Sequence, residues 1–88
     1  MKLKNGFVLK KENGQNIIVC TDKTISFDNI IMLNETNALL FDRLSEGPRT
    51  KEELLNLLLD EFDISTILAL NDIDVFIKTL KQNGVIEE

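Results

Sequence analysis

The side chains able to do chemistry in this chain of 88 residues form no recognisable catalytic set. The sequence has no histidine, which is the commonest general base and the commonest metal ligand in proteins. Its one cysteine, Cys20, ends the apolar run that begins at Ile17, so we interpret it as a sheet or core side chain. The carboxylates between Glu52 and Asp63 lack the spacing and the glycine of a calcium loop. The sequence therefore predicts no enzymatic activity, no metal site and no cofactor.

The net charge of −5 is unevenly distributed along the chain. Residues 1–33 carry five lysines against three acidic residues, whereas residues 34–88 carry five basic against twelve acidic residues. No stretch approaches the ~18 consecutive apolar residues of a membrane span, and the N-terminus lacks the apolar region of a secretion signal. We therefore expect a single domain over residues 1–88 that works in the cytoplasm without membrane contact.

Three β-prone runs occupy the first part of the chain. Residues 7–11 and 15–20 are joined by a segment containing Asn13-Gly14, which supplies the positive φ angles that a tight hairpin needs. A third β-prone run covers residues 28–33. These runs predict a small three-stranded antiparallel sheet.

Three helices are predicted after the strands, each with a start signal. Asn34 is placed to cap the first, and Thr50 with Glu53 forms a capping box at the second. Gly47 and Gly84 are typical stop signals of the first and third helices. The helices are predicted over residues 35–45, 51–61 and 66–83. The third keeps an apolar stripe that consists of Ile67, Leu70, Ile73, Phe76, Ile77 and Leu80.

Three strands followed by three helices, with a short turn between the last two helices, are the elements of a winged helix-turn-helix domain. The predicted fold class is therefore α+β. After the last helix, Val85-Ile86 is apolar enough to pack back on the core.

The third strand is apolar at every position from Ile30 to Leu33, although a strand presents its side chains to two faces alternately. Ile31 and Leu33 should point to one face of the sheet and Ile30 and Met32 to the other. In a domain this small, the helices can cover only one of these faces well. One alternative is that the chain itself, or a second copy, covers the other face. The second alternative is a groove between this strand and the helix over 66–83, with the strand edge open to an incoming peptide.

The helix over 66–83 raises the same question. At 100° per residue Val75 lies about 200° around the helix from Ile73, well away from the core. Two surface strips flank this helix, and the sequence does not decide which of them faces the strand. One strip is Asp72, Val75 and Thr79, and the other is Asp74, Lys78 and Lys81.

A winged helix that binds DNA needs a basic face toward the phosphates. Here the exposed side chains of the helix over 66–83 are nearly balanced in charge, within a half of the chain that carries −7. We therefore predict that the protein has no nucleic acid partner. A DNA-binding transcriptional regulator is the alternative function for a domain of this fold.

The chain resembles the PqqD family, the small peptide-binding proteins of pyrroloquinoline quinone biosynthesis and, more broadly, recognition elements for ribosomally made, modified peptides. The likeness covers nearly the whole chain. It is carried by the junction Leu33-Asn34-Glu35-Thr36, by Gly47 with Arg49-Thr50-x-Glu52-Glu53-Leu54, and by Phe76-Ile77-x-x-Leu80-x-x-x-Gly84-Val85-Ile86.

The resemblance implies that the leader segment of a precursor peptide adds as an extra strand beside the third strand, next to the last helix. The protein would be a stand-alone adaptor, monomeric or weakly dimeric, for a radical S-adenosylmethionine enzyme or another peptide-modifying enzyme. The expected peptide-binding residues are Asn29, Ile30, Ile31, Met32, Leu33, Asp72, Val75, Phe76, Lys78 and Thr79.

Overall fold

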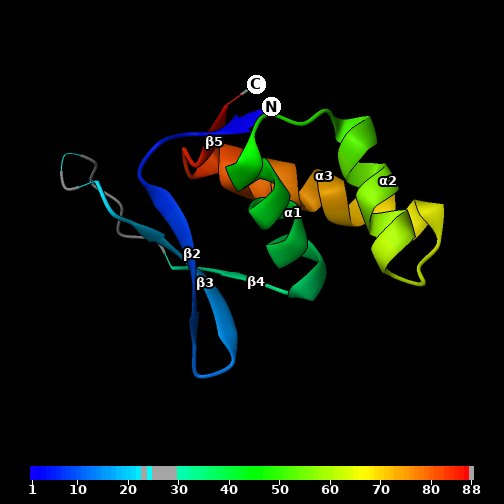
Figure 1. Cartoon of the computed structure of the whole chain (residues 1–88), viewed down its shortest axis with the longest axis horizontal. Coiled ribbons are helices and arrows are strands. Elements are labelled where there is room, and N and C mark those ends of the chain that lie inside the picture. Colours follow the sequence, from blue (N-terminus) through cyan, green and yellow to red (C-terminus); the bar gives the residue numbers. More distant parts are fainter. Residues whose placement is uncertain (23, 25–29, 88) are drawn as a thin grey trace.

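Five short strands and three helices make up the part of the chain that the structure, a computed structural model, describes: residues 1–22, 24 and 30–87 (Figure 1). In chain order they are β1 (Lys2–Leu3), β2 (Phe7–Glu12), β3 (Gln15–Cys20), β4 (Ile31–Leu33), α1 (Glu35–Glu46), α2 (Lys51–Glu61), α3 (Thr66–Gln82) and β5 (Ile86–Glu87). The predicted α+β order, a three-stranded antiparallel sheet followed by three helices, is confirmed.

The sheet has the strand order β2-β3-β4, and both neighbouring pairs are antiparallel. The turn of the β2-β3 hairpin consists of Asn13 and Gly14, whose φ angles are 51° and 76°. The residues on either side of the turn, Glu12 and Gln15, are paired in the sheet. Two successive positive φ angles suit the right-handed twist of the flanking strands. The strand predicted over 28–33 begins at Ile31, and residues 28 and 29 lie outside the described part of the chain.

Side-chain caps start the helices where the sequence predicted them. The Asn34 Oδ1 atom accepts a 2.9 Å hydrogen bond from the Asn37 backbone at the start of α1. At α2, the Thr50 Oγ1 atom accepts from the Glu53 amide at 3.1 Å, and the Glu53 Oε1 atom accepts from the Thr50 amide at 3.0 Å. These bonds satisfy amides that have no carbonyl partner within the helix.

The capping box makes the stability of the fold depend on pH. The hydrogen bond from the Thr50 backbone, followed by that of its side chain, lowers the pKa of Glu53 below its ordinary value of 4.5. A carboxylate with a depressed pKa in the folded state stabilises the protein above the unfolded pKa, and this contribution is lost as the pH falls through the folded value.

We expect Glu53→Ala to lower the urea midpoint at neutral pH. The difference from the wild-type protein should shrink as the pH falls from the ordinary value of 4.5 through the lowered pKa of the folded state, because the carboxylate is then protonated in both states. The matched control is Glu52→Ala, which removes a neighbouring first-turn carboxylate that takes no part in the capping box. A pH-independent difference for Glu53→Ala would contradict the assigned role of its charge.

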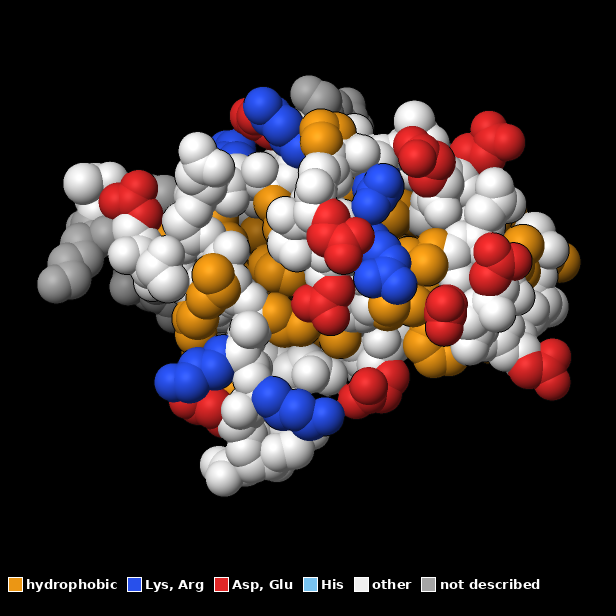
Figure 2. Space-filling view, in the orientation of Figure 1, with side chains coloured by type: hydrophobic (Ala, Val, Ile, Leu, Met, Phe, Trp, Pro, Cys, Tyr) orange, Lys and Arg blue, Asp and Glu red, His pale blue; other side chains and the backbone are white. Residues whose placement is uncertain are grey.

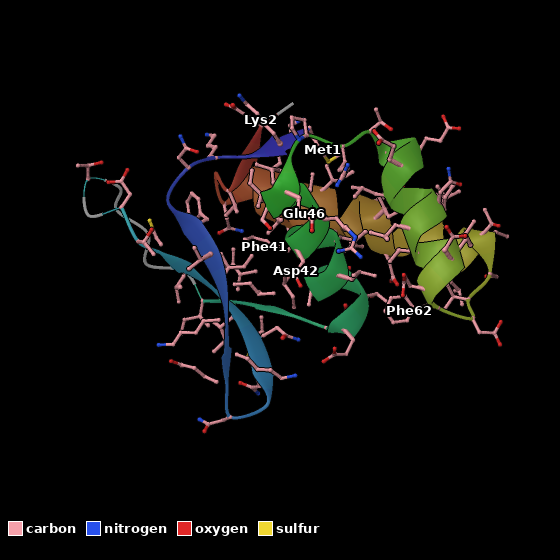
Figure 3. All side chains as sticks on the ribbon, viewed as in Figure 1. Met1, Lys2, Phe41, Asp42, Glu46 and Phe62 are labelled. Atoms are coloured by element: carbon pink, nitrogen blue, oxygen red, sulfur yellow. The ribbon has the colours of Figure 1, made fainter. Side chains whose placement is uncertain are left out.

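Among the described residues, one hydrophobic core joins the sheet to the helices. Phe41 of α1 is 1% exposed and lies on the sheet side of that helix, while Asp42 and Glu46 lie on its exposed face (Figure 3). The core side chains are Phe7, Ile18, Ile31, Leu33, Ala38, Leu40, Phe41, Leu44, Leu54, Leu58, Ala69, Ile73, Phe76, Leu80, Val85 and Ile86. The prediction that Val85-Ile86 packs back on the core is confirmed.

The sequence did not predict the second, two-stranded sheet, which pairs β1 with β5 (Figure 1). Its register places Lys2 opposite Glu87 and Leu3 opposite Ile86, and an ion pair of 3.2 Å joins Lys2 Nζ to Glu87 Oε1. Strands of two residues are too short to show any hydrophobic alternation. This sheet brings the two ends of the described chain together beside α1 and α3.

The apolar stripe predicted on α3 is partly wrong. Ile73, Phe76 and Leu80 are buried as expected, but Ile67 is 78% exposed. At 100° per residue Ile67 lies about 120° around the helix from Ile73, which takes it off the buried face. In the part of the chain that the structure describes, no helix is long and apolar enough to cross a membrane.

Candidate functional site

Strand β4 lies at the edge of its sheet, and no other described strand pairs with its outer side. Ile31 and Leu33 are buried, at 7% and 8% exposure, whereas Met32 is 59% exposed. Ile30, just before the strand, is 78% exposed. The predicted alternation is confirmed, and the alternative in which the described chain covers both sets of side chains is wrong.

The exposed side of β4 continues an apolar strip across the outer face of the sheet. Met32 lies opposite Ile17 of β3, which is half-buried. Farther along β3, Val19 is half-buried and lies opposite Val8 of β2, which is 44% exposed. The helices cover the other face of the sheet, so this strip has no covering layer among the described residues.

On α3 the structure separates the residues expected to contact a peptide into exposed and buried ones. Val75 is 58% exposed and Lys78 is also exposed, while Asp72 and Thr79 are half-buried. Phe76 is 1% exposed and belongs to the core, so its side chain is not on the surface. The structure places Phe76 behind the surface strip, and its expected contact with a peptide stays a prediction.

Two exposed apolar residues of α3, Ile67 and Leu68, were not among the expected site residues. Leu68 is 57% exposed, and Ala69 beside it is fully buried. Leu68 lies seven residues before Val75, a spacing that places both on one side of a helix. This spacing was present in the sequence and could have identified Leu68.

The strip that faces α2 can now be recognised. Lys51, at the start of α2, forms an ion pair with Asp74, with a distance of 2.5 Å between Nζ and Oδ1. The strip that contains Asp74 is therefore on the α2 side of α3. The strip of Asp72, Val75 and Thr79 lies on the opposite flank, which α2 does not cover.

Three surface hollows of the described chain have no lining residue from β4 or from this flank of α3. They adjoin α1, one beside residues 2–7, one beside α2 and one beside the hairpin. Asn29, another expected site residue, lies outside the described residues. Within residues 1–22, 24 and 30–87, no group of three or more Cys, Asp and Glu side chains is placed to hold a metal ion.

Charges are distributed over the surface much as they are along the chain. Figure 2 shows lysines around the β2-β3 hairpin and acidic side chains spread over the helical part. Several basic side chains on this surface are paired with acidic ones, as in the 3.1 Å contact of Lys10 with Glu12 and the 3.3 Å contact of Arg49 with Glu46. Such exposed pairs contribute little to stability.

The chemistry available at the candidate site is main-chain hydrogen bonding along the β4 edge, next to exposed apolar side chains. An edge strand of this kind can accept another strand, and side chains that alternate along that strand then meet the neighbouring surface. Fold and site together define a class: a small winged-helix-like α+β domain with an open sheet edge.

The family model described as coenzyme PQQ synthesis protein D (PqqD) matches residues 10–86. The chain therefore belongs to the PqqD family. This finding confirms the family expected from the sequence motifs.

Solved structures share the fold across almost the whole chain. A structure of TbiB1 in complex with the TbiA(beta) leader peptide has a TM-score of 0.75 at 18% identity and covers 99% of this chain and 95% of its own. A lasso peptide synthetase B1 complexed with the leader peptide has a TM-score of 0.72 at 21% identity, with coverage of 99% and 96%. Among curated proteins, none matches this sequence.

Proposed function

We propose that this protein is a non-catalytic adaptor that binds the leader segment of a ribosomally made precursor peptide. The leader adds as a strand to the free edge of β4, next to the α3 flank that carries Val75. The observation that carries this proposal is the edge strand β4, which buries Ile31 and Leu33 but exposes Met32. Membership of the PqqD family and the likeness in fold to two proteins solved with leader peptides support it.

Strand addition explains how a surface without a deep pocket can bind a peptide. Main-chain hydrogen bonds to an edge strand provide affinity for any extended peptide, and contacts with alternate side chains provide selectivity. The exposed Met32 and Ile30 would then be covered by the leader or by residues that follow it. A second layer over these side chains removes apolar surface from water.

The adaptor makes no bond in the peptide and acts in the cytoplasm, where ribosomes supply the precursor. By holding the leader, it raises the effective concentration of the rest of the peptide at the active site of a partner enzyme. The partner that the PqqD resemblance favours is a radical S-adenosylmethionine enzyme, and other peptide-modifying enzymes would use the same adaptor chemistry. The adaptor is monomeric or weakly dimeric in this proposal.

The test is capture from the native host with the tagged full chain as bait, followed by titration of the recovered peptide. We expect a short precursor peptide and a large modifying enzyme, with binding of the N-terminal leader segment and not of the remainder. Calorimetry with the two synthetic halves of the precursor separates these possibilities. Saturable binding by the non-leader half alone would contradict the proposal.

The same preparation tests the other two readings. A transcriptional regulator would bind duplex DNA with an affinity that falls steeply between two salt concentrations. In a dimer, β4 would pair with β4 of a second copy. Light scattering across a dilution series would then show the molecular mass falling toward that of the monomer. Either result, without peptide binding, would replace the adaptor proposal.

A further inference from the structure

The α3 flank next to the proposed leader site carries one carboxylate between two exposed apolar side chains. Leu68 and Val75 are 57% and 58% exposed, and Asp72 lies between them along the helix. Asp72 is half-buried, and in the described part of the chain its carboxylate takes part in no ion pair or side-chain hydrogen bond. A carboxylate next to apolar surface gains most from a cationic partner that is shielded from water.

Asp72 differs in this respect from the nearest carboxylate on the same helix. Asp74 is exposed and already has a cation, Lys51. At 100° per residue Lys78 lies about 120° around α3 from Asp72 but only about 60° from Val75, so this lysine adjoins the Val75 end of the flank and not the Asp72 carboxylate. The charge at the centre of this flank, the Asp72 position, is therefore negative.

We infer that the flank of Leu68, Asp72 and Val75 selects a leader segment in which a basic side chain is flanked, two positions away on each side, by apolar side chains. This inference rests on the proposed function and specifies the chemistry of its ligand. The motif is apolar-x-basic-x-apolar, and its symmetry makes it independent of the direction in which the leader strand runs.

The spacing of the helix matches that of a strand lying alongside it. A helix rises about 1.5 Å per residue, so Leu68 and Asp72 are separated by about 6 Å along the axis. Side chains on one face of a strand are about 6.6 Å apart, since they are two residues apart. If the first apolar side chain of the motif contacts Leu68, the basic side chain two residues along the leader lies beside Asp72. The third, about 13 Å from the first, lies between Val75 and Thr79.

The probes are two synthetic peptides with the sequence Leu-Thr-X-Thr-Leu, in which residue X is Lys in one peptide and Glu in the other. Each is titrated into the full chain and followed by amide chemical shifts, which detect weak binding. We expect the Lys peptide to bind about tenfold more tightly than the Glu peptide, with shifts at β4 and α3, because like charges repel when they face each other. Equal affinities, or no saturable shifts with either peptide, would overturn the inference.

Variants separate the local charge of Asp72 from the net negative charge of the protein. Asp72→Asn should remove most of the preference for Lys, and Asp72→Lys should reverse it. The matched control Asp74→Asn changes the net charge by the same amount and should keep the preference. An equal loss with Asp72→Asn and Asp74→Asn would overturn the inference, because the preference would then come from the net charge alone.

Failure of this inference is distinguishable from failure of the proposed function. The natural leader recovered by capture is titrated against the wild-type protein and against Asp72→Lys, with folding checked by circular dichroism. If the leader binds at β4 and Asp72→Lys leaves its affinity unchanged, the inference is wrong and the adaptor function stands. If the leader does not bind the wild-type protein, the adaptor function itself is wrong.

Discussion

Met32→Asp is expected to weaken leader binding by about 30-fold or more while leaving the fold intact. Met32 is 59% exposed in the free protein, so a carboxylate there remains hydrated and costs little in stability. In the complex the same carboxylate would be placed against apolar side chains of the added strand. Burying a polar group without a partner costs about 2 kcal/mol or more, which corresponds to that change in dissociation constant.

The matched control for Met32→Asp is Val8→Asp. Val8 is also an exposed apolar residue on the outer face of the sheet, but it lies on β2, at the opposite edge from β4. We expect this variant to bind the leader with wild-type affinity in calorimetry. Equal losses in both variants would indicate that the leader covers the whole outer face. No loss in Met32→Asp would rule out the β4 edge as the binding site.

Phe76→Ala is expected to lower the free energy of unfolding by about 3–5 kcal/mol, a large part of the stability of a small domain. Phe76 is 1% exposed and packs in the core with Ile73 and Leu80, so truncation leaves a cavity that its neighbours fill only in part. Urea denaturation followed by circular dichroism measures this loss. Any loss of peptide binding in this variant should follow the fraction of unfolded protein.

Phe76→Leu separates the supporting position of Phe76 from direct contact with a peptide. Leucine keeps most of the apolar volume, so the domain should remain folded under native conditions. We expect the folded variant to bind the leader within about threefold of the wild-type affinity, less than 1 kcal/mol. A loss as large as that of Met32→Asp, in a protein shown to be folded, would place the Phe76 ring in the binding site.

Local signals in the sequence determined where most elements begin and end. The Asn13-Gly14 turn, the Asn34 cap and the Thr50 capping box each act within a few residues of the backbone that they shape. The helix predicted over 51–61 has those bounds, and the other two helices end within one residue of the predicted bounds. Such interactions are readable from one sequence because every partner is a near neighbour in the chain.

The sequence also determined that the apolar side chains of β4 are divided between two faces of the sheet. A strand alternates its side chains with a period of two, so burying Ile31 and Leu33 leaves Met32 on the other face. The four apolar residues in succession therefore raised the question of what covers the second face, and the structure shows that Ile30 and Met32 are exposed.

Only the tertiary structure decided features that depend on residues distant in the sequence. The β1-β5 sheet joins Leu3 to Ile86, and no short-range pattern predicts such a pair. The Lys51–Asp74 ion pair identifies the α3 flank that faces α2 and leaves the Asp72 flank uncovered. Phe76 satisfied a sequence motif, but packing placed it in the core. Periodicity gives the angle of a side chain around its own helix, and only the neighbouring elements decide whether that angle faces protein or solvent.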